Sequence, residues 1–68
     1  MNIVLIGSGN VASVLGRLLI NKNHRIVQVT SRNIEHARIL ADELNAAFAD
    51  YNGELDKSAD LYIIAVSD

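Results

Sequence analysis

The stretch Gly7-Ser8-Gly9-Asn10-Val11-Ala12 decides the fold, because it joins two segments whose patterns predict a strand and a helix. Before it, residues 2–6 form a short apolar run that is typical of a strand buried on both faces of a parallel sheet. After it, apolar residues recur at helical spacing through residues 10–21. The chain therefore begins with a predicted strand, a tight turn and a helix.

The turn itself has the form G-x-G-x-x-G/A, which in this strand-to-helix context is typical of dinucleotide binding. Gly7 permits the tight turn, Gly9 lets a pyrophosphate approach the backbone, and the small Ala12 allows close helix packing. Free N–H groups and the positive dipole end at the helix start favour phosphate. The competing interpretation is an ordinary turn that binds nothing, in a purely structural unit. The sequence context favours dinucleotide binding.

Strand and helix patterns alternate along the rest of the chain. We expect a strand over residues 25–30, an amphipathic helix over 34–44 with Asn33 as its N-cap, a short strand over 46–49, a helical turn over 54–58 and a strand over 61–66. We also expect Tyr62 to lie in the core. This order predicts an α/β fold with a parallel sheet of strand order 3-2-1-4 and helices on both faces.

The end of the second predicted strand bears on the choice of cofactor. A unit that binds NAD normally has an acidic residue about 20 residues beyond the glycines, where it holds the ribose 2′-hydroxyl. Here the sequence is Thr30-Ser31-Arg32-Asn33, without a carboxylate. Ser31 can donate a hydrogen bond to a 2′-phosphate, and the guanidinium of Arg32 can bind it as a charged fork. The other interpretation is a solvated arginine beside a helix cap. The pattern favours NADP.

Composition narrows the class of protein. The chain has 68 residues, no cysteine, half of its residues hydrophobic and a net charge of −2. A nucleic-acid partner is disfavoured by this charge, no metal site is indicated, and no apolar run is long enough to span a bilayer. We expect a cytoplasmic protein. A complete doubly wound domain has about six strands, so we expect residues 1–68 to be a partial domain, a fragment of a larger protein.

The motifs together resemble a known superfamily over essentially the whole chain. Besides the glycine turn and Ser31-Arg32-Asn33, the run Ala59-Asp60-Leu61-Tyr62-Ile63-Ile64-Ala65-Val66 is similar to the NADP-binding half of reductases. These include pyrroline-5-carboxylate reductase, the 6-phosphogluconate dehydrogenase-like enzymes and Rossmann-like proteins with a helical C-terminal domain. The ending Ser67-Asp68 departs from the reductases, many of which have proline or lysine there.

The resemblance implies a set of cofactor-binding residues. It places Gly9, Asn10 and Val11 at the pyrophosphate, and Ser31, Arg32 and Asn33 at the 2′-phosphate. At the end of the last strand it places Ala65, Val66 and Ser67 along the cofactor. With Gly7 and Ser8 of the turn, the predicted cofactor-binding residues are Gly7, Ser8, Gly9, Asn10, Val11, Ser31, Arg32, Asn33, Ala65, Val66 and Ser67.

Other polar residues have weaker claims to function. We expect His24 and His36 to be surface residues, Asp50 to serve a turn or cap, and Tyr51 either to border the adenine pocket or to pack. For Asp68, a functional role and the lack of one are given equal weight. No catalytic residue is identified.

Two functions follow from this sequence. The first is the N-terminal NADP(H)-binding part of an oxidoreductase, transferring hydride between nicotinamide and a small C=N, C=O or alcohol substrate that a further C-terminal domain would hold. The alternative is a non-catalytic, nucleotide-sensing module that controls an attached domain. Such modules often carry an acidic residue where this chain has Ser31-Arg32, which favours the first. We also expect self-association, because an incomplete sheet exposes its last strand.

Overall fold

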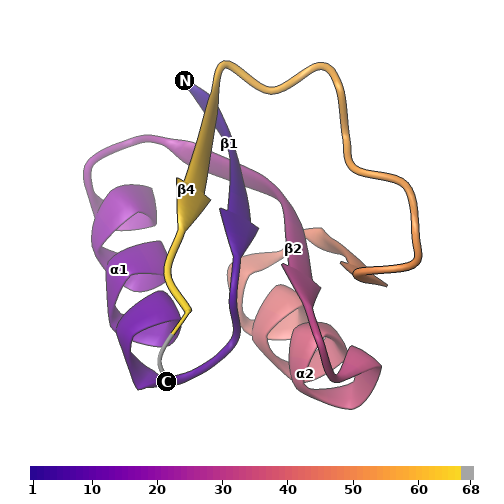
Figure 1. The fold of residues 1–68 in the computed structure, drawn as a ribbon. Helices are drawn as coiled ribbons and strands as arrows, with labels where there is room; N and C mark the ends of the chain where they lie inside the picture. The colour runs from indigo at the N-terminus through magenta and orange to yellow at the C-terminus, as the bar shows by residue number, and fades with distance from the viewer. Residues whose placement is uncertain (67–68) are drawn as a thin grey trace.

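The computed structural model describes residues 1–66, which form a four-stranded sheet and two helices (Figure 1). In chain order the elements are β1 (Asn2–Ile6), α1 (Asn10–Asn21), β2 (Arg25–Ser31), α2 (Ile34–Leu44), β3 (Ala47–Asp50) and β4 (Leu61–Ile64). Neighbouring strands run parallel in the order β3-β2-β1-β4. The predicted α/β class, the strand order and the ranges of both helices are confirmed.

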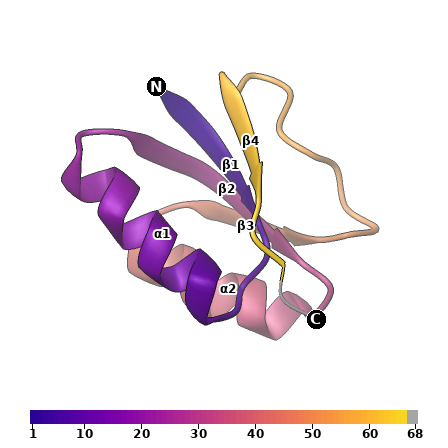
Figure 2. The same cartoon turned by 60° about the vertical axis from the view of Figure 1, so that its left-hand side comes forward.

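Both helices pack against the same face of the sheet, and this side contains the core (Figure 2). Ala12 of α1 and four residues of α2 form one buried cluster with strand residues. The members of this cluster are Ile3, Leu5, Ala12, Ile26, Val29, Ala37, Leu40, Ala41, Leu44 and Ala65. Gly16 lets the helices approach closely, because a Cβ there would lie 2.6 Å from Cδ1 of Leu44. The expectation of helices on both faces is therefore wrong for these residues.

The opposite face of the sheet is crossed by residues 51–60, which Figure 2 shows on the side away from the helices. Gln28 of β2 fixes this segment: its amide nitrogen donates to the carbonyl of Glu54, and its amide oxygen accepts from the Asp56 backbone, both at 2.8 Å. The predicted helical turn over residues 54–58 is absent. Ser58 instead donates from both its amide and its hydroxyl to Asp56, which forms a local turn.

Smaller differences concern the bounds of three strands, of which β2 ends at Ser31 rather than at residue 30. β3 begins and ends one residue later than predicted, and β4 ends at Ile64 rather than at residue 66. Tyr62 was expected in the core, but it points to the face that lacks helices and remains 38% exposed. Its hydroxyl donates to the carbonyl of Asp56, so it fastens the crossing segment instead of filling the core.

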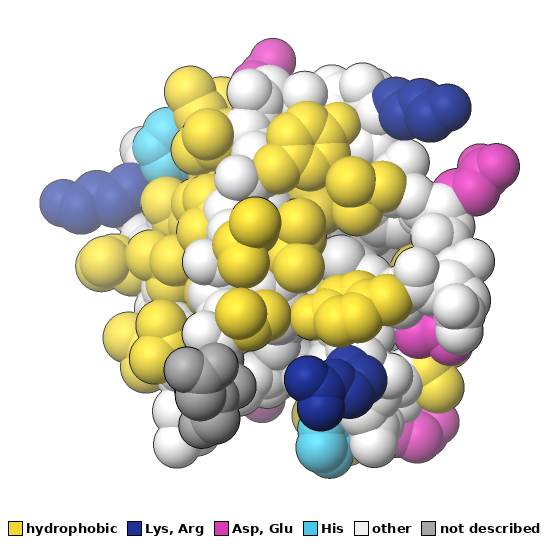
Figure 3. Space-filling view, viewed as in Figure 1, with side chains coloured by type: hydrophobic (Ala, Val, Ile, Leu, Met, Phe, Trp, Pro, Cys, Tyr) yellow, Lys and Arg dark blue, Asp and Glu magenta, His cyan; other side chains and the backbone are white. Residues whose placement is uncertain are grey.

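Apolar side chains remain exposed along β4 and the outer side of α1, and Figure 3 shows them as a broad yellow area. They include Val11, Val14, Leu18, Leu61, Ile64 and Val66. Monomeric proteins rarely expose large contiguous apolar areas. No helix among residues 1–66 is long and apolar enough to cross a membrane.

Candidate dinucleotide site

The loops that follow β1, β2 and β4 meet at the carboxyl edge of the sheet and enclose a hollow of about 310 Å³. We call it the rim hollow; it is lined by Gly7, Ser8, Gly9, Ser31, Arg32, Asn33, His36, Tyr51, Ala65 and Val66. β1 lies between β2 and β4, so the strand order reverses beside this hollow. Open α/β sheets bind their ligands at such a switch point.

Gly7 is required by the backbone at the end of β1. Its φ is +127°, a conformation that other residues rarely adopt, and its amide donates to the carbonyl of Thr30 at 2.8 Å. A Cβ built on Gly7 would lie 2.4 Å from the carbonyl oxygen of Ala65. The close approach of the loops after β1 and β4 therefore depends on glycine at this position.

Gly9 is different, because its backbone conformation does not demand a glycine. It is exposed and is the N-cap of α1, with φ −79° and ψ −167°, an extended conformation open to any residue. It has no side chain to cap the helix, and the first turn of α1 holds no acidic residue. Gly9 therefore provides no side-chain acceptor for the amides at the start of α1, and these amides can donate to a bound anion.

A pair of hydroxyl groups joins the glycine turn to the end of β2. The Oγ atoms of Ser8 and Ser31 lie 2.7 Å apart, and Ser31 is only 5% exposed. The Ser31 hydroxyl also accepts a long hydrogen bond from the amide of Asn33, at 3.4 Å. The two loops that line the rim hollow are therefore tied to each other through side chains.

Arg32 is exposed beside these hydroxyls, and it forms none of the ion pairs found within residues 1–66. By contrast, Arg17 pairs with Glu43, and Arg38 pairs with Glu35 and Asp42. No Asp or Glu lines the rim hollow in the described chain. The local charge therefore favours a phosphate over a bare ribose hydroxyl.

The start of α2 also faces the rim hollow, but its amides are already occupied. Oδ1 of Asn33 accepts from the amides of Glu35 and His36, at 2.9 and 3.2 Å. This confirms Asn33 as the predicted N-cap. A hydrogen bond from Arg38, together with its positive charge, lowers the pKa of the Glu35 carboxyl. Negative charge from the protein itself thus complements this helix end.

The structure brings most of the predicted cofactor-binding residues together, with three exceptions. Asn10 and Val11 do not line the rim hollow: the side chain of Val11 is 61% exposed on an apolar groove along α1, and Asn10 lies beside it. Their backbone amides nevertheless belong to the start of α1. Ser67, like Asp68, lies outside the described residues.

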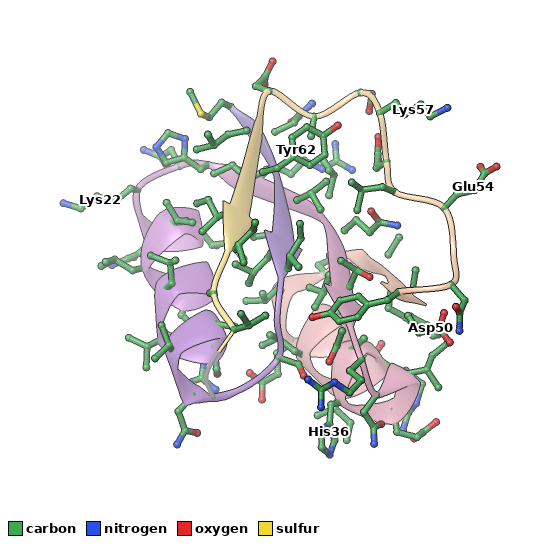
Figure 4. The ribbon with its side chains drawn as sticks, in the orientation of Figure 1. Lys22, His36, Asp50, Glu54, Lys57 and Tyr62 are labelled. Carbon is green, nitrogen blue, oxygen red and sulfur yellow. The ribbon has the colours of Figure 1, made fainter. Side chains whose placement is uncertain are left out.

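Two residues of the rim hollow were not among the predicted cofactor-binding set. Tyr51, for which the sequence left two interpretations open, is half exposed and lines the hollow. His36, expected to be an ordinary surface residue, lines it too, and Figure 4 shows it at the start of α2. The signal was available: a residue three positions after an N-cap lies on the first helical turn, next to the loop that carries Arg32.

Three other polar residues, Asp50, His24 and Asp56, form contacts away from the rim hollow. Asp50 accepts the amide of Asn52 at 3.0 Å, as expected for a turn residue. His24 lies at the opposite end of the sheet, where its Nδ1 is 3.1 Å from the N-terminal amine. Hydrogen bonds from Ser58 lower the pKa of Asp56. Within residues 1–66 no cluster of three His, Asp or Glu side chains could hold a metal.

The fold and the glycine turn define the chain as a Rossmann-type unit. A family described as "NADP oxidoreductase coenzyme F420-dependent" matches residues 2–67, and the chain belongs to this family. The resemblance to NADP-binding reductases is thereby confirmed at the level of the superfamily.

Two relatives illustrate the similarity. The structure of a "putative NADP oxidoreductase" from Bacteroides fragilis superposes with a TM-score of 0.90 and is 45% identical, over 98% of this chain and 26% of that one. A glutamyl-tRNA reductase from Methanococcus aeolicus is 38% identical over 66 residues, which are 94% of this chain and 17% of that protein. The chain thus spans about a quarter or less of the length of these relatives.

Proposed function

We propose that this chain is the NADP(H)-binding part of an oxidoreductase, with the rim hollow as the adenosine and phosphate end of the cofactor site. One hollow, lined by no described carboxylate, brings together a helix start whose N-cap has no side chain and an exposed arginine that forms no ion pair within residues 1–66. This is the observation that supports the proposal most directly. Both features suit a cofactor with a pyrophosphate and an additional phosphate.

Each part of the rim hollow has a task in this proposal. The amides after Gly9 bind the pyrophosphate, and the guanidinium of Arg32 binds the 2′-phosphate as a two-pronged donor. Ser31 is buried and bonded to Ser8, so its part is chiefly to hold the two phosphate-binding loops at a fixed spacing. Tyr51 offers an exposed aromatic surface on which the adenine ring can stack. Ala65, Val66 and Ser67 follow β4 on the path toward the nicotinamide.

The names of the relatives support a division of labour between this chain and the rest of such proteins. The family description names coenzyme F420 and one relative's name specifies glutamyl-tRNA, although each match covers nearly the whole of this chain. What these proteins share is an oxidation–reduction, so the matched segment is best assigned to the shared cofactor. We therefore place the binding of a small C=N, C=O or alcohol substrate in further domains of a longer protein.

The cofactor, when bound, supplies the hydride chemistry. The chain contributes binding and orientation: it holds the phosphates at the carboxyl edge of the sheet and directs the rest of the cofactor past β4. None of the described residues is assigned a catalytic role.

Calorimetric titration with NADPH and NADH tests the proposal. We expect NADPH to bind more tightly, and Arg32→Ala to weaken NADPH by roughly 10- to 100-fold, since a hydrogen bond to a charged group contributes about 1.5–3 kcal/mol. NADH binding should change little, because NADH lacks the 2′-phosphate.

Arg38→Ala is the matched control. Arg38 lies on the same helix–loop segment but pairs with Glu35 and Asp42 and does not line the rim hollow. Its loss should leave NADPH affinity nearly unchanged. Equal affinity of the wild-type protein for the two nucleotides, or equal loss of NADPH affinity in both arginine variants, would contradict the proposal.

A further inference from the structure

We propose that His36 is a second, pH-dependent contact to the 2′-phosphate, so that the part of the preference for NADP(H) over NAD(H) that His36 supplies increases as the pH falls from about 8 to about 6. This inference rests on the proposed function and adds a form of regulation to the same site. It starts from the cations available at the rim hollow. Among the residues that line it, only Arg32 and His36 can carry a positive charge.

The other cations of the described chain are placed elsewhere. Figure 4 shows Lys22 and Lys57 well away from the labelled His36, toward the opposite end of the sheet. Arg17 and Arg38 are engaged with carboxylates, and Arg25 begins β2 beside Asn2, at the opposite edge of the sheet. In Figure 3 a histidine and a basic side chain adjoin each other at the lower rim, the region in which Figure 4 places His36. His36 is therefore the side chain that can supplement Arg32.

The position of His36 is set by the backbone, whereas its imidazole is left free to act. Its amide donates to Asn33 at 3.2 Å, which fixes the residue in the first turn of α2. No side-chain hydrogen bond of His36 occurs within residues 1–66, and the side chain is exposed. Because the Asn33 side chain already accepts from the amides of Glu35 and His36, a phosphate beside Arg32 would meet the side chain of His36 rather than these amides.

The charged groups around His36 belong to several elements. Arg32, in the loop after β2, and Tyr51, after β3, share the rim hollow with it. On the other side, Glu43 of α2 lines an adjoining hollow with His36, but it is paired with Arg17 of α1 at 2.8 Å. Glu35 precedes it and is paired with Arg38. Both of these carboxylates are paired with arginines, so a bound phosphate would be an unpaired anion beside the imidazole.

Histidine is the side chain whose charge ordinarily changes between pH 5 and pH 8. A phosphate dianion next to an imidazole favours the protonated ring, so binding of NADP⁺ takes up a proton in this pH range. Arg32 supplies a part of the affinity that does not depend on this histidine. His36 supplies a part that is absent at high pH.

The test is calorimetric titration of NADP⁺ and NAD⁺ at pH 8.5 and pH 6.0, with wild-type protein, His36→Gln and His36→Lys. Protonation of the 2′-phosphate itself changes affinity in all three proteins, so the quantity to follow is the ratio of wild-type to His36→Gln affinity. For NADP⁺ we expect this ratio to rise from about 1 at pH 8.5 to about 3–5 at pH 6.0, as for an exposed charge pair. For NAD⁺ it should stay near 1 at both values. The His36→Lys variant should bind NADP⁺ more tightly than the His36→Gln variant at both pH values.

His24→Gln provides the matched control, because it removes the other histidine of the chain at the far end of the sheet. The NADP⁺ affinity of this variant should equal that of the wild-type protein at both pH values. Titration at pH 6.5 in buffers of different ionisation enthalpy should show more proton uptake with NADP⁺ in the wild-type protein than in His36→Gln.

Two failures can be told apart. If NADP⁺ is preferred at pH 8.5 through Arg32, but wild type and His36→Gln keep the same affinity ratio at both pH values, the inference about His36 is overturned and the proposed function stands. If NADP⁺ is not preferred over NAD⁺ at pH 8.5, the proposed function fails and the inference fails with it.

Discussion

The two helices begin at the same edge of the sheet, only a few residues from the rim hollow, yet their first turns are built differently. α1 begins at Gly9, which has no side chain, and its first turn contains no acidic residue. α2 begins at Asn33, whose side chain accepts two amides, and Glu35 follows in its first turn. The start of α2 is completed by the protein, whereas that of α1 is left for a ligand. Local capping chemistry thus separates a structural helix end from a phosphate-binding one.

Gly7→Ala should have the largest effect, because it removes the turn that presents the start of α1. The new Cβ would combine a strained positive φ with a 2.4 Å approach to the Ala65 carbonyl. We expect a loss of about 3 kcal/mol or more in unfolding free energy, a large part of the stability of a small domain. Urea denaturation followed by circular dichroism measures it. Unchanged stability would show that the loops after β1 and β4 do not need this close approach.

Gly9→Asn gives the start of α1 the same N-cap residue that the start of α2 has in Asn33. The extended backbone accepts any residue, so stability should stay the same or rise by a few tenths of a kcal/mol. The new side chain would occupy amides intended for phosphate, and NADPH affinity should fall about tenfold or more. Calorimetry together with urea denaturation tests both parts. Full retention of NADPH affinity would show that the difference between the two N-caps does not serve phosphate binding.

Asn33→Ala makes the reciprocal change by opening the start of α2. Two amides lose their acceptor, which should lower the unfolding free energy by about 1 kcal/mol. NADPH affinity should fall less than in Gly9→Asn, because this helix end is not the pyrophosphate site. The same two measurements apply. A larger loss of NADPH affinity in Asn33→Ala than in Gly9→Asn would place the pyrophosphate at α2.

Glu35→Gln should have the smallest effect. A hydrogen bond from Arg38 and its charge lower the pKa of the Glu35 carboxyl in the folded protein. Because this pKa is lower in the folded than in the unfolded protein, the ionised carboxylate stabilises the fold at pH values above the usual Glu pKa. This stabilisation is lost as the pH falls through the folded-state pKa. Thermal unfolding should therefore show a slightly lower Tm for the variant at pH 7 and a smaller difference at pH 3. An equal difference at both pH values would have another cause.

Local patterns sufficed for most of the fold. Apolar periodicity, the glycine turn and the Asn33 cap set the ranges of both helices, and the alternation of strands and helices set the sheet order. The path of residues 51–60 could not be read in this way, because Gln28, more than 25 residues earlier, holds it in place. A buried glutamine within an apolar strand was the signal of such a partner. Tyr62 was misplaced because periodicity does not show which sheet face has helices.

The candidate site was predictable to a similar extent. Residue types identified Gly7, Gly9 and Arg32, since each has a chemistry that the motif requires. The hydroxyl contact between Ser8 and Ser31 was not foreseen, because it joins loops 23 residues apart. His36 was taken for a surface residue because its side chain does not belong to a motif, although its position three residues after the Asn33 cap was a signal that it lies beside the β2 loop.

The central claim is that the start of α1 is a phosphate site and the start of α2 is not. Amide ¹H–¹⁵N spectra recorded during titration with NADPH test it most directly. The largest shifts should occur at the amides of Asn10, Val11 and Ala12, with smaller ones at Glu35 and His36, which remain bonded to Asn33. Shifts concentrated at the start of α2, with the first turn of α1 unaffected, would contradict the account.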